Sequence, residues 1–371
     1  MTAGYGEGHN AAARALATAF NEETPDTALV VDIFELSCPR LNSLVRRAYL
    51  TAINGTPRLW RRIYAWMDSP GFMTRGARML RPQSKLLAAV IERERPAAVC
   101  STFPAYAALF ERLSRAGRFH GPHFNVVTDS ISINSIWWRH GCDGWFVPNE
   151  DSADVMRAAG VDPALIHVTG FPVTPFFRKN EGIVSRPQLS EGAAPRVLYI
   201  VNSGTQNAEA TARLLLAEDD WEVTCTVGRD ESLRRALSAI AVKRRRQTDI
   251  LGWTDQIPRL LMTHHVVVSK AGGATTQEAI AARCPMIVNQ VVPGQEEGNC
   301  ELLLRHRAGA LAITPESVVE TLRAAFANRG RAWDGWRAAL ETLSRPDAAR
   351  AIAAHVLAHV NRGAGEPVAA R

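Results

Sequence analysis

The chain has 371 residues, a hydrophobic content of 46%, a charged content of 22% and a formal net charge of +6, which are ordinary values for a globular protein large enough to form two domains. No apolar run approaches the roughly 18–20 residues that a membrane span needs, and the first residues lack the pattern of a signal peptide. The six cysteines show no C-x-x-C spacing, which argues against a zinc or disulfide framework and favours a reducing cytoplasm.

The N-terminal residues form a glycine-rich loop that opens a helix, predicted over residues 8–20. Gly6 and Gly8 fit only the looser dinucleotide fingerprint, because Ala11 stands where the strict motif has glycine. The small residues let a substrate approach the backbone, and His9 at the mouth of the loop can act as a general base on an acceptor hydroxyl. The competing interpretation makes His9 a cap at the start of the helix.

A glycine loop of this kind normally follows the first, central strand of a doubly wound sheet. Only Met1, Thr2 and Ala3 precede it here, so we expect the natural protein to begin upstream. An apolar run encoded in frame before Met1 would support this expectation, and a stop codon there would contradict it.

Residues 40–95 are strongly basic, with 12 Lys and Arg against 3 Asp and Glu. Within them, arginines alternate with leucines and aromatic residues over residues 44–66, which is typical of a helix at an anionic membrane surface. The residues assigned to this surface are Arg58, Trp60, Arg61, Arg62 and Tyr64. An ordinary helix pair with a solvated face explains the same pattern, and RNA binding would use the same residue types although no nucleic-acid motif accompanies them.

Strand-like runs alternate with helix-like runs along the chain, which is typical of parallel sheets covered by helices on both faces. Strands are predicted at 29–34, 97–100, 124–127, 144–147 and 167–169, then at 197–201, 222–227, 250–251, 266–269 and 286–289. Helices are predicted at 152–160, 231–241 and 332–360, among others. The polar stretch 178–196 separates the two series of strands. The fold class is therefore α/β, with doubly wound domains at residues 1–178 and 179–371.

Asp129 ends one of the predicted strands, and the ends of parallel strands are where open α/β sheets bind ligands. This position makes its carboxylate a candidate polar contact for a substrate. A cap for a helix or turn is the alternative role.

The stretch from Ser269 to Asn299 carries the richest pattern in the chain: the end of a buried strand, two glycines, a helix start, a second strand and a polar loop. Gly272 and Gly273 let the backbone turn sharply, and the N–H groups of the following helix favour an anion. Gln295 and Glu296 can hydrogen-bond hydroxyl groups, although such a loop pair is often plain solvated surface. Together these parts suit a ligand with phosphates and hydroxyls, such as a nucleotide-sugar.

Glu278 has two interpretations that the sequence leaves nearly even. Thr275 precedes it with the spacing of a capping box, in which both side chains satisfy N–H groups at a helix start. Alternatively, its carboxylate accepts hydrogen bonds from ribose hydroxyls. No Asp-x-Asp and no His/Cys cluster with ligand spacing occurs, so neither a metal nor a cofactor is predicted.

These motifs resemble those of the diacylglycerol glycosyltransferases, the group of monogalactosyldiacylglycerol synthases and processive diacylglycerol glucosyltransferases, which are relatives of the enzyme that forms lipid II. The resemblance spans about residues 3–312, in the family's order, and its C-terminal motif is the most specific part. The matching segments are Gly6-x-Gly8-His9, Tyr49 with Pro57-Arg58-Leu59-Trp60 and Tyr64, Thr128-Asp129, Thr169-Gly170-x-Pro172-Val173, Gly228-Arg229-Asp230, Lys270-Ala271-Gly272-Gly273, Glu278-Ala279, Pro285 and Pro293-Gly294-Gln295-Glu296 with Asn299.

The resemblance implies a GT-B fold, with two Rossmann-like domains facing a central cleft, and metal-independent, inverting transfer of a hexose from a UDP-hexose substrate to diacylglycerol. His9 and Asp129 match the acceptor side, with Gly6 and Gly8 beside them. The residues that match the donor side are Gly228, Arg229, Lys270, Gly272, Gly273, Thr275, Glu278, Pro293, Gly294, Gln295, Glu296 and Asn299. The basic segment would hold such an enzyme on the inner, cytoplasmic face of the anionic cell membrane.

One segment departs from the family pattern. Residues 202–207 stand where the family has a glycine-rich loop, which puts the diphosphate contacts on that side in doubt. Other functions remain open: transfer to a polyprenyl lipid or a soluble aglycone, UDP-sugar 2-epimerisation on the same fold, or nucleotide-sugar sensing without catalysis. The sequence chooses neither glucose nor galactose, and it indicates no oligomeric state.

Overall fold

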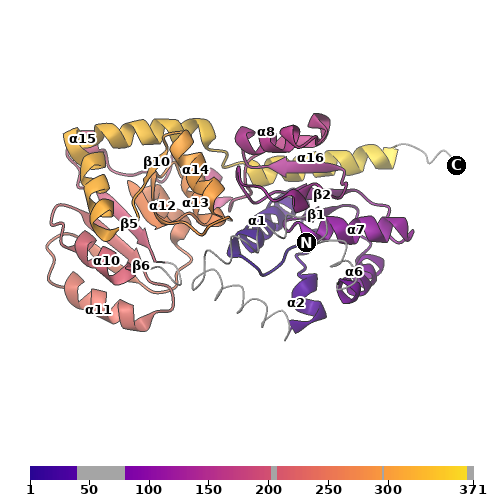
Figure 1. Ribbon diagram of the computed structural model, residues 1–371, viewed down its shortest axis with the longest axis horizontal. Helices are drawn as coiled ribbons and strands as arrows, with labels where there is room; N and C mark the ends of the chain where they lie inside the picture. Colours follow the sequence, from indigo (N-terminus) through magenta and orange to yellow (C-terminus); the bar gives the residue numbers. More distant parts are fainter. Residues whose placement is uncertain (40–79, 202–206, 295, 366–371) are drawn as a thin grey trace. The chain divides into compact units, whose positions relative to one another are not determined.

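The chain forms two compact α/β units (Figure 1). The computed structural model describes residues 1–39, 80–201, 207–294 and 296–365. The first unit comprises residues 1–175, 293–295 and 347–371, and the second comprises residues 176–292 and 296–346. The change of unit after Pro175 lies close to the boundary expected at 178. The C-terminal segment groups with the first unit, whereas the sequence-based division kept residues 179–371 together.

The first unit is built on a parallel sheet in the order β1-β2-β3-β4. The strands are β1 (Val99–Ser101), β2 (His123–Val126), β3 (Gly144–Val147) and β4 (Ile166–Val168). The helices and 3-10 turns are α1 (Glu7–Glu23), α2 (Ile33–Ser37), α6 (Arg81–Glu94), α7 (Ala105–Arg115), η1 (Ser135–Trp137), α8 (Glu150–Ala158), η2 (Pro163–Leu165) and α16 (Ala348–Gly365). Apolar residues from α2, α6 and α7 form one core cluster, and those from α1 and α16 form another with Phe124 and Phe146 of the sheet.

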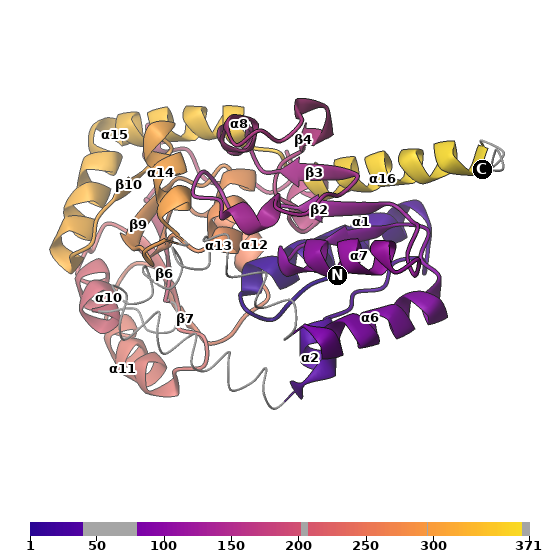
Figure 2. The ribbon, with the colours of Figure 1, turned by 45° about the vertical axis from the view of Figure 1, so that its right-hand side comes forward.

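The position of α16 explains why the end of the chain groups with the first unit. This helix packs against α1, and both views of the ribbon show it running across that unit (Figure 1 and Figure 2). Its buried face includes Ile352, Ala353 and Val356. The single helix predicted over 332–360 is wrong, because Pro346 separates α16 from the helix that ends at Leu343.

Residues Met1–Ala3 extend the first sheet beyond β1. The Met1 ammonium donates to the Cys100 carbonyl oxygen at 2.7 Å, and the Thr102 N–H donates back to the Met1 carbonyl at 2.9 Å. On the other side, the Thr2 N–H donates to the Val31 carbonyl at 3.0 Å. These bonds tie Met1–Ala3 to a neighbouring segment on each side, and Thr2 forms an isolated parallel bridge with Asp32.

The strand predicted over 29–34 is wrong, because this segment makes only an isolated bridge at Asp32 and α2 begins at Ile33. The carboxylate of Asp32 accepts a hydrogen bond from the Glu35 N–H at 2.9 Å and thereby caps this helix. Its other oxygen accepts from the Gly4 N–H at 2.8 Å, which anchors the glycine loop.

The second unit contains a six-stranded parallel sheet in the order β10-β9-β8-β5-β6-β7. The strands are β5 (Arg196–Ile200), β6 (Glu222–Thr226), β7 (Thr248–Leu251), β8 (Val266–Lys270), β9 (Met286–Gln290) and β10 (Gly309–Leu311). The helices and 3-10 turn are α9 (Phe176–Lys179), η3 (Leu189–Glu191), α10 (Ala208–Leu216), α11 (Glu231–Ala241), α12 (Ile257–Thr263), α13 (Gly273–Ala281), α14 (Glu297–Arg305) and α15 (Pro315–Leu343), which is interrupted at Ala327–Gly330.

The order of the second sheet reverses between β8 and β5, because β5 to β7 are added on one side and β8 to β10 on the other. In open α/β sheets, ligands bind at the carboxyl ends of the strands beside such a reversal. The predicted α/β class with two parallel sheets is therefore confirmed. In the second sheet, the reversal places the expected ligand-binding position at the carboxyl end of β8.

Candidate functional site

His9 lies in the first turn of α1, and the backbone rather than its side chain begins that helix. Gly6 is the N-cap residue in an extended conformation, and no side chain caps the turn. The interpretation of His9 as a helix-start cap is therefore wrong, and its imidazole is available for another role.

Thr102, which follows β1, contacts both the imidazole and the backbone of His9. Its Nδ1 atom lies 2.6 Å from the Thr102 carbonyl oxygen, and the Thr102 hydroxyl donates to the His9 carbonyl at 3.0 Å. Because a carbonyl oxygen only accepts, the hydrogen of the neutral ring sits on Nδ1. Thr128, which follows β2, places its hydroxyl oxygen 3.0 Å from the same nitrogen. The lone pair of the neutral ring is consequently on Nε2.

Asp129 is the charged neighbour of His9. Burial lowers the pKa of His9, and the negative charge of Asp129 opposes this shift. Burial likewise raises the pKa of Asp129, opposed by His9 and by a hydrogen bond from Trp137. In that bond the indole Nε1–H donates to Asp129 Oδ2 at 2.7 Å. The adjacent turn η1 is capped by Asn134, so the alternative role of Asp129 as a cap receives no support there.

Aromatic rings surround this acid–base pair. Phe103 stacks on Tyr5 with 5.6 Å between ring centroids, and His9 meets the same Phe103 edge-on at 5.2 Å. Trp137 is fully buried and lies 6.4 Å from the His9 ring. Sequence reasoning missed Thr102, Phe103 and Trp137. Thr102 and Phe103 follow a predicted strand, the same positional signal that identified Asp129.

In the second unit, the end of β8 leads directly into α13. Gly272 is the N-cap of α13, and no side chain caps that turn, so the first N–H groups are available to an anion. Thr275 lies inside the first turn and not at the N-cap, which rules out the capping box with Glu278. Glu278 thus sits partly exposed in the middle of a helix whose start faces the strand reversal.

Lys270 and Glu296 join the end of β8 to the loop after β9. Lys270 Nζ lies 2.6 Å from Glu296 Oε1, and Glu296 Oε2 accepts from the Val292 N–H at 3.0 Å. Glu296 is almost fully buried, so its carboxylate organises the loop from within. Asn299 adds a second tie, because its Nδ2 donates to the Ala271 carbonyl at 3.1 Å.

The remaining donor-side residues have separate local roles. In Pro293-Gly294, Gly294 adopts a φ of +84°, which favours glycine. Gly228 likewise has a φ of +59° where the chain turns after β6, and Arg229 is exposed beside it. Asp230 caps α11 by accepting from the Leu233 N–H at 2.9 Å.

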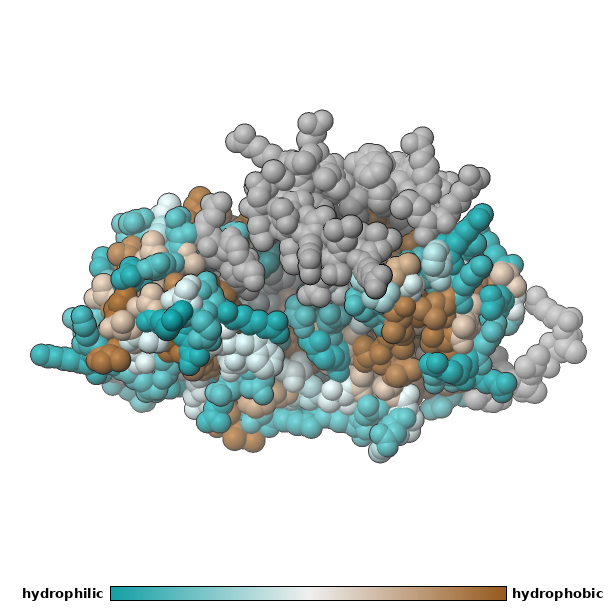
Figure 3. Space-filling view, turned by 90° about the horizontal axis from the view of Figure 1, so that it is seen from below, coloured by the Kyte–Doolittle hydropathy of each residue, from teal (hydrophilic) through white to brown (hydrophobic). Residues whose placement is uncertain are grey.

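Several predicted positions lie outside the described residues: Gln295, the loop 202–206, and the membrane-surface residues Arg58, Trp60, Arg61, Arg62 and Tyr64. Within the described part of the chain, no group of three His, Cys, Asp or Glu side chains is arranged to hold a metal ion. None of the helices described combines the length and hydrophobicity needed to cross a bilayer. The face in Figure 3 carries an apolar area in its right-hand part, next to polar surface.

The structure thus brings His9 and Asp129 together at the ends of β1 and β2 in the first unit. In the second unit it gathers Lys270, Glu296 and the start of α13 at the ends of β8 and β9.

Comparison with known proteins identifies similar sequences. Residues 9–173 match the family model described as monogalactosyldiacylglycerol (MGDG) synthase. The processive diacylglycerol beta-glucosyltransferase of Bacillus cytotoxicus is 25% identical over 358 residues, which cover 95% of this chain and 91% of that protein. These matches confirm the resemblance to diacylglycerol glycosyltransferases as a distant homology.

Solved structures extend the comparison to the fold. MurG of Acinetobacter baumannii matches with a TM-score of 0.53 and 13% identity, over 76% of this chain and 80% of that one. The UDP-GlcNAc 2-epimerase of Neisseria meningitidis, solved with bound UDP-GlcNAc, matches with a TM-score of 0.55 and 13% identity, over 76% and 81%. At this identity the matches bear on the fold alone, and they confirm the predicted GT-B class.

Proposed function

We propose that this chain, a distant relative of the diacylglycerol glycosyltransferases with a GT-B fold, transfers a hexose from a UDP-sugar to the free hydroxyl of diacylglycerol. The observation that carries the proposal is the fixed tautomer of His9. Its Nδ1–H is committed to the Thr102 carbonyl at 2.6 Å, which leaves Nε2 as a proton acceptor.

The acceptor step requires a neutral base, and burial favours the neutral form of His9. As the lipid hydroxyl oxygen attacks the anomeric carbon, Nε2 takes the hydroxyl proton and the bond from that carbon to the diphosphate oxygen breaks. The electron pair of that bond leaves with UDP. Because the hydroxyl oxygen attacks in line with the departing diphosphate, the anomeric configuration inverts and a β-glycosyl lipid forms from an α-linked donor. The nearby carboxylate of Asp129 stabilises the imidazolium that results.

The donor step requires stabilisation of the negative charge that develops on the departing UDP. The uncapped N–H groups at the start of α13 supply fixed partial positive charge, and the Lys270 ammonium lies next to them. Glu278 is the proposed ribose contact, because the capping-box role is ruled out. Thr275, in the first turn of α13, completes the proposed donor site together with Gln295 and Arg229.

Glu296 acquires a modified role in this proposal. Both of its oxygens accept hydrogen bonds from within the protein, one from Lys270 and one from the Val292 N–H. We therefore assign it to holding the sugar-side loop and Lys270 in place. Each carboxylate oxygen retains a second lone pair, with which it can also accept a sugar hydroxyl.

The acceptor dissolves in a bilayer, so the enzyme has to work at its surface. The basic and aromatic residues between Arg40 and Tyr64 are the proposed attachment to the anionic inner face of the cell membrane. The protein would then be a peripheral enzyme of the cytoplasmic side.

The direct test incubates the full chain with radiolabelled UDP-glucose or UDP-galactose and vesicles that contain diacylglycerol and an anionic phospholipid. Labelled β-glycosyl diacylglycerol is expected with at least one donor, also in the presence of EDTA, and not with His9→Ala. No glycolipid from either donor would contradict the proposal. Product from a polyprenyl acceptor alone, or epimerised UDP-GlcNAc without an acceptor, would favour the corresponding alternative function.

A further inference from the structure

The second unit contains a cavity of about 250 Å³ that lies apart from the donor residues. Its walls come from α9 and the segment that follows it, from the C-terminal ends of α12 and α13, and from α15. Because the chain passes from the end of α13 at Ala281 to the start of β9 at Met286, this is the amino edge of the sheet. The proposed donor contacts follow β8 and β9 at the opposite, carboxyl edge.

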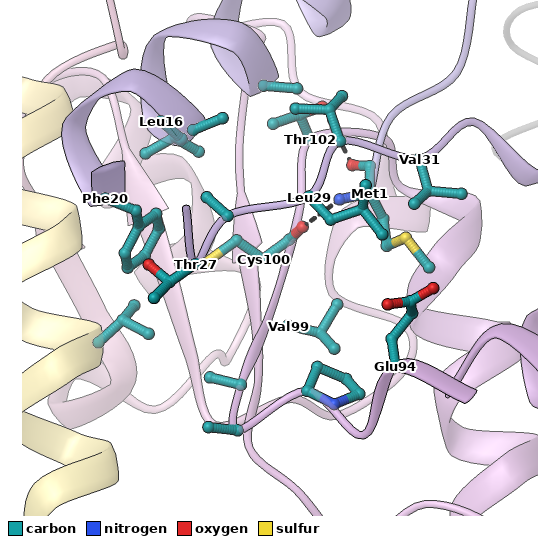
Figure 4. Close-up of a pocket in the computed structure, with 18 of the residues that line it drawn as sticks. Met1, Leu16, Phe20, Thr27, Leu29, Val31, Glu94, Val99, Cys100 and Thr102 are labelled. Carbon is teal, nitrogen blue, oxygen red and sulfur yellow. Dashed lines mark hydrogen bonds between the residues drawn. The ribbon is translucent and has the colours of Figure 1, made fainter. Parts of the chain in front are cut away.

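Charge distinguishes this cavity from the cavity of the first unit. In the first unit (Figure 4), the walls are mainly apolar, and Glu94 is the one charged side chain among the described residues that line them. The cavity of the second unit is lined by three arginines, Arg186, Arg283 and Arg337. Glu181 adds one carboxylate, so the formal charge of the described lining side chains is +2, from three arginines and one glutamate. We call this cavity the arginine pocket.

Arg186 is held in place by the ends of two helices. Its Nη1 donates to the Arg283 carbonyl at 2.7 Å, and its Nη2 donates to the carbonyls of Leu261 and Ala282 at 3.0 and 2.9 Å. These bonds use three of the five N–H groups of a guanidinium. Its Nε is buried and finds no acceptor within the described part of the chain. Arg186 therefore has a structural role and still retains unpaired donors.

Arg283 and Arg337 have fewer partners than Arg186. Arg283 Nη2 donates to Glu181 Oε1 at 2.6 Å, while its Nε is buried without an acceptor among the residues that the structure describes. The guanidinium of Arg337 lies over the Trp333 ring, 5.8 Å from the ring centroid. It forms no ion pair with any described residue. The positive charge of Arg337 thus has no carboxylate to offset it in that part of the chain.

The three cations lie close enough to repel one another. Burial lowers the pKa of Arg186, and the positive charges of Arg337 and Arg283 act in the same direction. Partly buried guanidinium groups without a matching number of carboxylates are costly to bring together. An anion in the pocket would offset this repulsion and would accept hydrogen bonds from the unpaired N–H groups.

We propose that the arginine pocket binds a small phosphate monoester. The planar forks of arginine match the oxygen atoms of phosphate, and a dianion balances the formal charge of +2. The remaining walls, with Phe177, Met262 and Pro346 among them, are apolar and suit the organic part of an ester. The volume lies below the roughly 300–1,000 Å³ of pockets for drug-sized ligands, which points to a smaller ligand. The inference is independent of the proposed glycosyl transfer.

The test measures the binding of inorganic phosphate and of phenyl phosphate to the full chain by calorimetry at constant ionic strength. Both probes should bind saturably, and phenyl phosphate at least as tightly as the free ion, because its ring meets the apolar walls. Saturable binding of neither probe would overturn the proposal. Clearly weaker binding of phenyl phosphate than of inorganic phosphate would exclude an ester as the ligand.

A pair of variants on α15 locates the bound anion. Arg337→Gln removes the cation that no described carboxylate offsets, and Arg331→Gln is the matched control, because Arg331 is exposed on the same helix and does not line the pocket. Arg337→Gln should weaken both probes at least about tenfold, the effect of losing one hydrogen bond between charged groups. Arg331→Gln should bind like the parent chain. Equal affinity in the two variants would place the anion elsewhere and refute the site.

A measurement on the parent chain covers the case in which Arg337→Gln fails to fold. Phenylglyoxal modifies accessible arginine side chains, and mass spectrometry of the resulting peptides gives the extent of modification at each arginine. Phenyl phosphate should protect Arg337 and leave Arg331 as reactive as before. Equal reactivity of Arg337 with and without phenyl phosphate would refute the site.

Discussion

Lys270 and Glu296, which lie on different elements of the second unit, form an ion pair with 2.6 Å between Nζ and Oε1. The lysine side chain is 29% exposed and the glutamate side chain 7% exposed. The pair links the end of β8 to the loop that precedes α14, which are the two segments assigned to the donor.

Because Glu296 is more deeply buried than Lys270, replacing one partner should lower the free energy of unfolding by a different amount than replacing the other. Lys270→Met leaves a buried carboxylate without its cation and should lower the free energy of unfolding by roughly 3 kcal/mol. Glu296→Gln leaves a partly solvated ammonium and should cost clearly less, on the order of 1 kcal/mol. Urea unfolding of both single variants and of the double variant measures the coupling.

The exposed pair Arg213–Glu209 on α10 provides the matched control, because Glu209→Gln should change stability by less than about 0.5 kcal/mol. Equal costs for Lys270→Met and Glu296→Gln would contradict the proposed asymmetry. The same variants should weaken UDP binding, since both disturb the loop.

In the proposed mechanism, protonation of His9 causes the fall of kcat/KM at low pH, which is the acid limb of the pH profile. Burial lowers its pKa, so kcat/KM should fall only below about pH 6.5, the ordinary value for histidine. Asp129→Asn removes the charge that raises this pKa and should move the limb to lower pH while reducing the maximal rate. His9→Ala should abolish turnover and leave UDP affinity intact. An acid limb above pH 6.5, or activity in His9→Ala, would exclude His9 as the base.

Substitution of Glu278 can separate an effect on donor binding from an effect on stability. Because α13 begins at Gly273, Glu278 makes no capping box with Thr275. Glu278→Gln should weaken UDP at least tenfold, about 1.4 kcal/mol, with little change in Tm. Thr275→Ala is the companion variant, and its Tm should likewise change little. A large loss of Tm in both variants would restore the capping interpretation.

The strongest sequence signals concern elements that local chemistry determines. Three consecutive valines predict the buried strand β8, and Asp230 caps α11 at its predicted start. The same local chemistry explains the error at 29–34. Asp32 caps a helix inside what reads as an apolar strand, and only the fold shows that its side chain is turned to Glu35.

The features that sequence reasoning missed are long-range. The partners of His9 are Thr102 and Thr128, about a hundred residues away, and they meet it only because parallel strands end at one edge of the sheet. Lys270 and Glu296 were both predicted as donor contacts, but their pairing depends on the register of β8 and β9. The return of α16 to the first unit follows from its apolar face, whose destination no local pattern reveals.

The basic segment tests the membrane assignment, although its residues lie outside the described part of the structure. Changing Arg58, Arg61 and Arg62 to glutamate should reduce binding to anionic vesicles, because each arginine near such a surface contributes about 1 kcal/mol. Vesicle co-sedimentation at low and high salt measures the effect. Three arginines of the second unit, Arg213, Arg234 and Arg235, serve as the control set. Equal binding by both sets of variants would remove the membrane role.

Two buried histidines at the base of the second sheet predict a loss of stability in acid. His265 Nδ1 accepts from the Arg196 N–H and its Nε2–H donates to the Pro187 carbonyl, both at 2.8 Å, an arrangement open only to the neutral ring. His264 donates through Nδ1 to Leu260 and accepts at Nε2 from the Thr224 hydroxyl. Burial lowers the pKa of each to about 4.

Acid destabilises the folded chain because the unfolded chain binds protons at a higher pH than the folded chain does. The unfolded chain protonates these histidines near pH 6.5 and the folded chain near pH 4, so stability is complete above pH 6.5 and falls as the pH drops between these values. At pH 5 each histidine should have lowered the free energy of unfolding by on the order of 2 kcal/mol. Urea unfolding at pH 7 and pH 5 can be followed by tryptophan fluorescence, to which Trp333 contributes from beside His265, where its Nε1–H donates to the His265 carbonyl at 2.7 Å. The fall between the two pH values should be smaller in His265→Gln than in the parent chain, while the surface variant His120→Gln should match the parent. An unchanged fall in His265→Gln would show that the buried ring is not the group that the acid protonates.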